Sequence, residues 1–366
     1  MRLMFVYWAW ADQGSGNVIQ GYTHAARALG HEVVVYGPPN PKIPLNYSMD
    51  MESADAVVFI FEWTTQLQYG DQLDLVRLVG SVPRSRRIIV DGDGNYNEPI
   101  RVDDDYNHKD AASRDRWVEF CDSLADKICQ PTLHPLRSNV LPFLFYAYSP
   151  AWEVPLTSMA TDYTMGYTGH AKFRWRPMRQ VLDAIEPVRE RLGRIGLVGV
   201  GWDQLPWWAS QMAIEDWYVS DPEYLKRMQI EVLPPVAFPD VIKTMSRALF
   251  NPVLLRPIFR HLKFVTPRVF ETLAASTIPL FVADATYVKE IYGGTAGDLV
   301  MRPDDLRDQI LDIVDRPEHY REIVSGIRRH LAVHHSHAAR LRQLIGIVED
   351  RQGTATRHGK AVQTCG

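Results

Sequence analysis

The sequence predicts an α/β protein made of two doubly wound domains that face a central cleft. The chain of 366 residues is long enough for two domains of ordinary size. Strand-like apolar runs alternate with helical periodicity, which favours parallel sheets covered by helices on both faces. This alternation begins at residue 2 and restarts near residue 163. Ligands of such sheets bind beyond the carboxyl ends of the strands, so residues at those ends are the candidates for function.

The first half begins as a strand, a glycine-containing turn, a helix and a second strand. Later apolar runs predict three more strands, with helical stretches between them. A proline-containing connector over residues 146–161 ends this half. The expected elements before it are the strand 2–10, the turn 12–17, the helix 18–30, the strand 31–37, the strand 54–63, the helix 67–80, the strand 86–94, the helix 111–124, the strand 126–132 and the closing segment 138–150.

The second half repeats the pattern of strands and helices. We therefore expect one domain over residues 1–160 and another over 161–350, with the last helix able to pack back on the first domain. The polar residues 351–366 are expected to form a disordered tail. The elements expected in this half are the strand 163–169, the helix 176–193, the strand 194–202, the helix 238–248, the strand 249–253, the helix 266–274 and the strand 278–283.

Composition excludes several classes of protein. No apolar run is long enough to cross a bilayer, and the N-terminus lacks the pattern of a secretory signal. Three cysteines form no CxxC pair, which favours reduced thiols and a cytoplasmic location over a zinc site. A net charge of −4 without a long basic run makes nucleic acid an unlikely partner. The oligomeric state is left open.

Two turns in the first half carry candidate residues. Residues 14–17, which are Gly14, Ser15, Gly16 and Asn17, precede the first helix, but the third glycine is too late and no acidic residue follows for a dinucleotide fingerprint. The better interpretation is a turn whose backbone N–H groups face the cleft, and the alternative is a turn with only a structural role. The "DGDGN" turn fails as a calcium loop, because its sixth and twelfth positions do not fit. Asp91 and Asp93 are then candidates for contact with an acceptor or for a solvated turn.

Two turns in the second half lie at predicted strand ends. "GYTGHAKFRWRP" places Gly169 before three cations, Lys172, Arg174 and Arg176, and such a basic turn suits a phosphate or a diphosphate as well as a solvated loop. "VGVGWDQLPWW" places Gly201 and Trp202 at the next strand end. Two more tryptophans follow there, and they fit either sugar stacking or, more commonly, a core. The i, i+4 pair His330 and His334 lacks a third metal ligand, so no metal site is predicted.

The stretch "TPRVFETLAASTIPLFVAD" contains one carboxylate among apolar residues. Thr266 is a candidate N-cap, and Pro267 suits the first helical turn. The free N–H groups of this helix end and the side chain of Arg268 could hold phosphates. Glu271 lies one turn into the helix, where a contact with the helix dipole competes with a ligand-binding role.

The order of these motifs resembles the group 1 glycosyltransferases with the GT-B fold, which has two Rossmann-like domains. The matching segments are "GxG…AARALGHEVVVYG", "MGYTG…R", "VGVGW", "ALFNPV" and "PRVFETLA", and the subgroup that they resemble most is the spore-maturation-protein type. The resemblance implies a hexosyltransferase that moves a sugar from a nucleoside-diphosphate sugar to a small-molecule or glycan acceptor. It implies donor binding by the C-terminal domain, acceptor binding by the N-terminal domain, and no metal or other cofactor.

The resemblance also implies roles for individual residues. Glu271 matches the carboxylate that binds the donor ribose, and Lys172, Arg174 and Arg268 would bind the diphosphate. Further donor-binding residues would be Gly169, Gly201, Trp202, Leu233, Val236, Asn251, Thr266 and Pro267, with Asp91, Asp93 and residues 14–17 on the acceptor side.

One departure from the family pattern affects the expected chemistry. Many group 1 enzymes carry a second Glu eight residues before the ribose-binding one, and Lys263 stands at that position here. A cation there would favour the leaving diphosphate, so Lys263 joins Lys172, Arg174 and Asp93 as a catalytic candidate, in a reaction that we expect to be retaining. Two alternatives stay open: a GT-B nucleotide-sugar epimerase or phosphorylase, and an inactive binding protein on the same scaffold.

Overall fold

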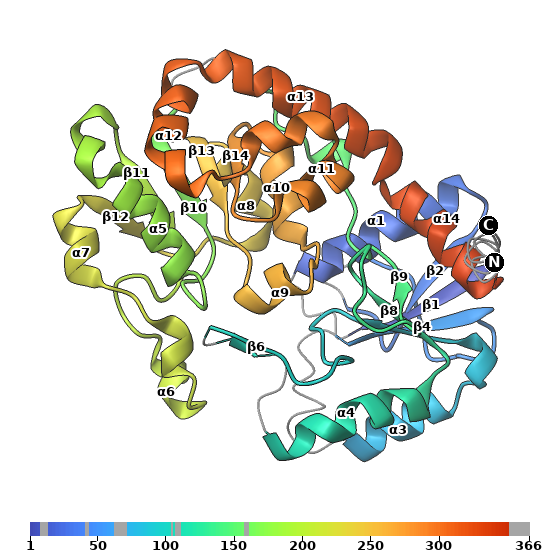
Figure 1. The fold of residues 1–366 in the computed structure, drawn as a ribbon. Coiled ribbons are helices and arrows are strands. Elements are labelled where there is room, and N and C mark those ends of the chain that lie inside the picture. Colours follow the sequence, from blue (N-terminus) through green and yellow to red (C-terminus); the bar gives the residue numbers. More distant parts are fainter. Residues whose placement is uncertain are drawn as a thin grey trace, which may run out of the picture. The chain divides into compact units, whose positions relative to one another are not determined.

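The computed structural model describes residues 1–7, 14–40, 44–61, 72–103, 105–106, 111–156 and 161–350. The chain divides into two compact units (Figure 1). The first unit comprises Met1–Ile100, Asn107–Ala147 and Ser336–Gly366, and the second comprises Arg101–Tyr106 and Tyr148–His335. The chain therefore enters the second unit briefly at Arg101–Tyr106, and it returns to the first unit at Ser336. The predicted tail, 351–366, lies outside the described residues.

The first unit contains a parallel sheet of seven strands in the order β3-β2-β1-β4-β5-β8-β9. Its central strand β4 is apolar throughout and buried, as expected for a parallel sheet covered on both faces. Helices α1 (Gly14–Ala28) and α14 (His337–Val348) pack together over one face, and α3 (Gln72–Gly80) and α4 (Ala111–Leu124) pack together on the other (Figure 1). The strands are β1 (Arg2–Val6), β2 (Glu32–Tyr36), β3 (Tyr47–Ser48), β4 (Ala56–Phe61), β5 (Arg87–Asp91), β8 (Lys127–Gln130) and β9 (Leu141–Pro142).

The second unit contains a parallel sheet of five strands in the order β12-β11-β10-β13-β14. The chain winds outward from β10 in one direction and then returns to the other side of β10 with β13. The strands are β10 (Tyr163–Thr168), β11 (Ile195–Val198), β12 (Ile230–Leu233), β13 (Ala248–Val253) and β14 (Ile278–Phe281). Winding reverses between β10 and β13, and this switch point is where doubly wound sheets bind ligands.

Helices cover the second sheet, and a short hairpin from the first half of the chain joins the same unit. The hairpin consists of β6 (Arg101–Val102) and β7 (Asp105–Tyr106), which pair in antiparallel fashion. The helices are α5 (Trp175–Ile185), α6 (Trp207–Gln211), α7 (Pro222–Arg227), α8 (Val241–Met245), α9 (Pro257–His261), α10 (Pro267–Ala274), α11 (Ala285–Tyr292), α12 (Leu306–Asp315) and α13 (Pro317–His334).

The structure confirms the predicted fold class of two doubly wound parallel sheets. Several predicted helix bounds are wrong. Helix α1 already begins at Gly14, so the predicted turn at residues 14–17 is its first helical turn. The helix predicted over 176–193 ends at Ile185 and continues as a 3₁₀ turn to Arg191, because Pro187 has no N–H to continue the α-helical ladder. Among the described residues, no helix is long and apolar enough to cross a membrane.

Candidate active site

The strands β10 and β11 end at almost the same level, and backbone hydrogen bonds join the segments that follow them. The N–H of Gly169 donates to the carbonyl of Val198 at 2.8 Å, and the N–H of Ala171 donates to that of Val200 at 2.9 Å. Gly199 has φ +143°, and a Cβ there would collide with the carbonyl group of Gly169. Only glycine permits this close approach, which fixes the turn after β10 against the neighbouring strand.

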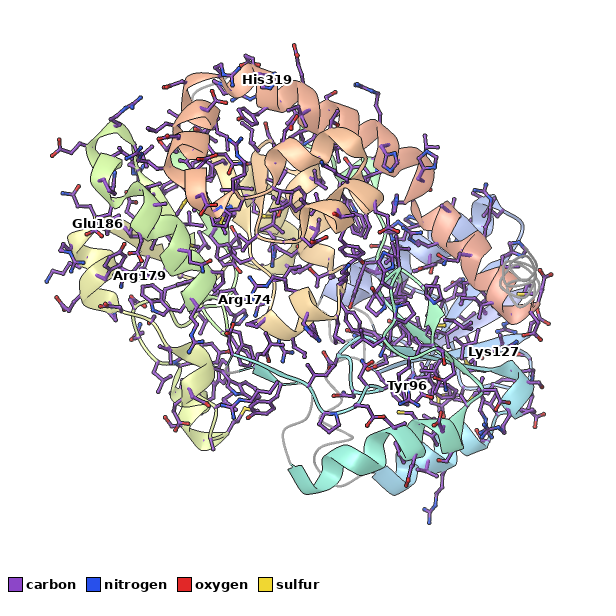
Figure 2. The ribbon with its side chains drawn as sticks, in the orientation of Figure 1. Tyr96, Lys127, Arg174, Arg179, Glu186 and His319 are labelled. Carbon is purple, nitrogen blue, oxygen red and sulfur yellow. The ribbon has the colours of Figure 1, made fainter. Side chains whose placement is uncertain are left out.

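Four cations gather at the switch point, and we call Lys172, Arg174, Arg256 and Arg268 the basic cluster. Lys172 and Arg174 follow β10, and Arg256 follows β13, so the two sides of the switch point each supply cations. Figure 2 shows Arg174 between the N-terminal end of α5 and α9. The Nη1 group of Arg174 donates to the carbonyl of Lys172 at 2.6 Å. The Lys172 ammonium lies 4.4 Å from the centroid of the Trp217 ring.

The basic cluster has more donors than the described protein groups satisfy. The Nε atom of Arg174 and the Nη1 atom of Arg268 are buried without a hydrogen-bond acceptor among the described residues. Burial lowers the pKa of Arg174, and the charges of Arg256 and Arg268 lower it further against the opposing effect of Tyr167. Concentrated positive charge with unused buried donors is the environment that binds a multivalent anion.

The pKa of His170 is lowered by burial and by the same positive charges. Desolvation and then the charges of Arg174, Lys172 and Arg268 lower the pKa of His170 to about 4. The imidazole is therefore neutral at pH 7 and can act as a hydrogen-bond donor or acceptor at the edge of the basic cluster.

Arg256 is held by Asp105, a residue far away in the sequence. The Asp105 carboxylate is completely buried and accepts from Nη2 of Arg256 at 2.7 Å and from its Nε at 3.3 Å. The same carboxylate accepts from the N–H of Ile258 at 3.1 Å, at the start of α9. The hairpin β6–β7 therefore orients one of the four cations through a bidentate pair.

Helix α10 supplies the carboxylate of the site. Thr266 occupies the N-cap position, although its side chain makes no capping hydrogen bond, and Pro267 is the first helical residue. Glu271 is only 4% exposed, and its Oε2 lies 3.0 Å from Nη1 of Arg268. This contact is an ion pair without hydrogen-bond alignment. Burial raises the pKa of Glu271, and Arg268 lowers it. Because Glu271 is the fifth residue of α10, it lies beyond the first turn, where the helix dipole acts.

Comparison with known proteins shows which families and structures this chain is similar to. Residues 176–346, a little under half of the chain, match the family described as glycosyl transferase-like. No curated protein matches the chain in sequence. Similar solved structures include an α-glucosyltransferase in complex with UDP and a 13-mer DNA, at 12% identity, with 95% of this chain and 99% of that one covered and a TM-score of 0.62. The chain has the GT-B fold, and the match over residues 176–346 supports a glycosyltransferase.

Two further structures have the same fold as this chain. Anabaena Alr3699/HepE in complex with UDP-glucose is 10% identical over 96% of this chain and all of that one, with a TM-score of 0.59. T4 phage BGT in complex with UDP and Mn²⁺ is 10% identical over 98% of this chain and 99% of that one, with a TM-score of 0.53. At such low identity these likenesses establish the fold alone.

Several of the predicted donor-binding residues lie in the framework of the second unit. Trp202 is completely buried, and its indole N–H donates to the carbonyl of Gly169 at 3.0 Å, so it supports the turn after β10. The Asn251 amide donates to the carbonyl of Met245 and to Oγ1 of Thr277, at 3.0 and 2.8 Å, within the core. These hydrogen bonds hold both side chains within the framework, so they do not favour a contact of either side chain with a ligand.

The remaining donor-side residues lie at strand and helix ends. Leu233 ends β12, and its carbonyl accepts from the N–H of Gly199 at 3.0 Å. Val236, three residues further on, is exposed. Lys263 follows α9 with φ +54°, and its ammonium lies 5.7 Å from the centroid of the Tyr287 ring.

Asp91 holds a loop of the first unit together. Its buried carboxylate accepts from the N–H groups of Asn95 and Tyr96 and from the side chain of Gln130, at 3.0, 2.8 and 2.8 Å. Burial raises the pKa of Asp91 to about 6 despite these bonds. The carboxylate therefore faces its own loop, and of the two predicted acceptor carboxylates only Asp93, which is partly exposed, keeps that role as a prediction. Among the described residues, no group of three His, Cys, Asp or Glu could hold a metal.

Sequence reasoning missed Arg256, its partner Asp105 and the role of His170. Arg256 comes after the carboxyl end of an apolar strand, and this pattern was sufficient to name it as a candidate site residue. Asp105 gave no such signal, because its partner is 151 positions away.

Proposed function

We propose that this glycosyltransferase transfers a sugar from a UDP-sugar to the hydroxyl group of a small-molecule or glycan acceptor. The observation that carries the proposal is the basic cluster at the switch point, with unused buried donors, beside the buried carboxylate of Glu271. Phosphates suit the cations, and a ribose suits the carboxylate. UDP or UDP-glucose is present in the similar structures, which supports this assignment of the two ligand parts.

In the proposed reaction, the bond between the sugar C1 and the diphosphate oxygen breaks, and a bond from C1 to the acceptor oxygen forms. The acceptor proton leaves with the diphosphate or with solvent, so UDP is the second product. Negative charge develops on the leaving group, and Lys172, Arg174 and Arg268 stabilise it. Lys263 would assist them. We propose that the reaction is retaining. We also propose that it needs no metal, because Lys172, Arg174, Arg268 and Lys263 neutralise the leaving group.

The two units would divide the substrates between them. We assign the donor to the second unit, within the predicted domain 161–350, and the acceptor to the first, within 1–160, where Asp93 and the N-terminal end of α1 are the candidates. One similar structure contains DNA, so the GT-B fold is compatible with a nucleic-acid acceptor. The assignment to the spore-maturation-protein subgroup and the cytoplasmic location are further parts of the proposal.

UDP is expected to stabilise the protein against heat in the presence of EDTA. A ligand at 100 times its Kd adds about 2.7 kcal/mol to the free energy of unfolding, which corresponds to several degrees in Tm. Thermal-shift measurements with UDP, GDP, ADP and UDP-glucose check this. An absence of stabilisation by every nucleotide would contradict the donor site. Stabilisation that vanishes in EDTA and returns with Mn²⁺ would contradict metal independence.

UDP is also expected to raise the pKa of His170. Without a ligand, burial and then the charges of the cations keep this pKa near 4, and a bound diphosphate would offset the contribution of the cations. Opposite charges within a few ångströms shift a pKa by about one pH unit or more. NMR titration of the imidazole C–H signals from pH 8 to 4 should show the midpoint of His170 at a higher pH when UDP is present. His319, which lies far from Arg174 in Figure 2, is the reference. An unchanged His170 at saturating UDP would mean that the diphosphate binds elsewhere.

A further inference from the structure

Most residues of one lobe in the second unit have no assigned role in the donor site. It covers residues 201–221, between β11 and α7, and includes α6 and a 3₁₀ turn over Glu215–Tyr218. In Figure 1, α6 extends away from the sheet of the second unit. We call this segment the α6 lobe.

Both ends of the α6 lobe are fixed to the turn that carries the basic cluster. At its start, the indole of Trp202 donates to the carbonyl of Gly169. Near its end, the carbonyl of Trp217 accepts from the N–H of Phe173 at 2.6 Å, and the Trp217 ring lies under the Lys172 ammonium. These contacts hold the lobe at a defined place beside the donor site.

The α6 lobe exposes large apolar side chains. Trp207 is 74% exposed, Val219 is 56% exposed and Leu205 is 46% exposed. The neighbouring Trp208 is instead half-buried, with its ring edge-on to Tyr218 at 5.4 Å between centroids. An exposed tryptophan on an anchored lobe next to a ligand site is typical of a recognition surface, because tryptophan is otherwise highly buried.

The charge of the α6 lobe restricts what it can bind. Four acidic residues lie in it, which are Asp203, Glu215, Asp216 and Asp221, and no Lys, Arg or His occurs between Arg194 and Lys226. Asp221 is engaged with the N–H of Tyr224 and with Arg179, whereas Asp203, Glu215 and Asp216 are exposed. A polyanion such as DNA is repelled by such a surface, because nucleic-acid binding depends on cations that contact phosphates. A sugar is attracted, because carboxylates accept hydrogen bonds from hydroxyl groups.

We propose that the α6 lobe binds the acceptor, and that this acceptor is a neutral or amino-bearing carbohydrate. The indole of Trp207 stacks on the apolar face of a sugar ring, and the exposed carboxylates accept hydrogen bonds from its hydroxyl or ammonium groups. The proposal rests on the proposed function and narrows its acceptor class. It adds a contribution of the donor-binding unit to acceptor recognition, and it argues against nucleic acid as the acceptor of this chain.

The test measures binding of the UDP-loaded full-length protein to an array of neutral, amino-bearing and sulfated oligosaccharides, with single-stranded and duplex 13-mer DNA on the same array. We expect binding to neutral or amino-bearing glycans. Trp207→Ala should weaken it by about tenfold or more, as ring stacking in binding sites does, and Trp207→Phe should weaken it less. Val333→Ala, which truncates an exposed residue of α13, should bind like the parent.

UDP binding, followed by thermal shift, separates this proposal from the proposed function. If the parent and Trp207→Ala bind UDP equally and only the variant loses glycan binding, the acceptor surface is confirmed. If the parent binds UDP but prefers DNA or sulfated glycans, or if no glycan binds, the inference is wrong while the donor site stands. Equal glycan binding by parent and Trp207→Ala also overturns it. A parent that does not bind UDP overturns the proposed function itself.

Discussion

Arg174→Ala is expected to reduce kcat/KM for the UDP-sugar by about 10²-fold or more, the usual cost of removing one preorganised donor from a charged transition state. Arg174 is already fixed by the carbonyl of Lys172, and its Nε has no acceptor among the described residues, so it meets the leaving diphosphate without reorganisation. Charge on the diphosphate grows as the C1–O bond breaks, so kcat should fall as well as the affinity for donor. Steady-state transfer kinetics with the UDP-sugar check this.

Arg176→Ala is the matched control for Arg174→Ala. Arg176 belongs to the same basic turn, but its side chain is exposed and lies 3.5 Å from Asp103 on the hairpin. Exposed pairs contribute little, about 0–1 kcal/mol, so this variant should retain nearly the parent kinetics. Arg174→Lys should recover part of the activity, since it keeps the charge and loses the planar fork of donors. Parent-like kinetics of Arg174→Ala, with an unchanged Tm, would mean that the turn after β10 is only a structural connection.

The sequence predicted those parts of the site whose signals are local. The turn at 169–176 was found because a strand pattern, a glycine and three cations follow one another within a few residues. Helix α10 was found with its N-cap position, its proline and its buried carboxylate, because helix starts and 3.6-residue periodicity are short-range features. The alternation of strands and helices also predicted that ligands bind beyond the carboxyl ends of the strands.

The sequence could not predict which way individual side chains point. Trp202 follows the end of β11, as predicted, and Asn251 lies within β13, but the polar groups of both side chains turn into the framework. The neighbours Trp207 and Trp208 look alike in the sequence, and only packing against Tyr218 separates the exposed ring from the half-buried one. The pair of Arg256 with Asp105 depends on a hairpin that crosses into the second unit, and no local pattern encodes such a crossing.

Glu271→Gln is expected to lower the affinity for UDP by roughly 10- to 150-fold, because a hydrogen bond to a charged group contributes about 1.5–3 kcal/mol. A ribose presents two hydroxyl donors, and the carboxylate can accept both at once. Glutamine keeps the size but replaces one acceptor oxygen by an NH₂ donor, so one of the two bonds should fail. The ribose does not react, so the loss should appear mainly in the donor KM, with a smaller change in kcat.

The stability of Glu271→Gln is expected to change little. Burial raises the pKa of Glu271, which means that its charge is costly in this place, and the neutral amide removes that cost. The lost ion pair with Arg268 opposes this gain, but the Arg268 side chain is 28% exposed and keeps contact with water. Glu223→Gln, at an exposed first-turn position of α7, is the control for a helix-dipole effect and should bind UDP like the parent.

Calorimetric titration of UDP into the parent and the two variants, each with its Tm, decides the role of Glu271. The dipole explanation is already weak, because Glu271 lies beyond the first turn of α10, where such effects are small. The Glu271 carboxylate lies 3.0 Å from Nη1 of Arg268 without hydrogen-bond alignment, and we expect its acceptor capacity to serve a ligand. A folded Glu271→Gln that binds UDP as tightly as the parent would show that this carboxylate serves only Arg268. The ribose would then have to lie elsewhere on the second unit.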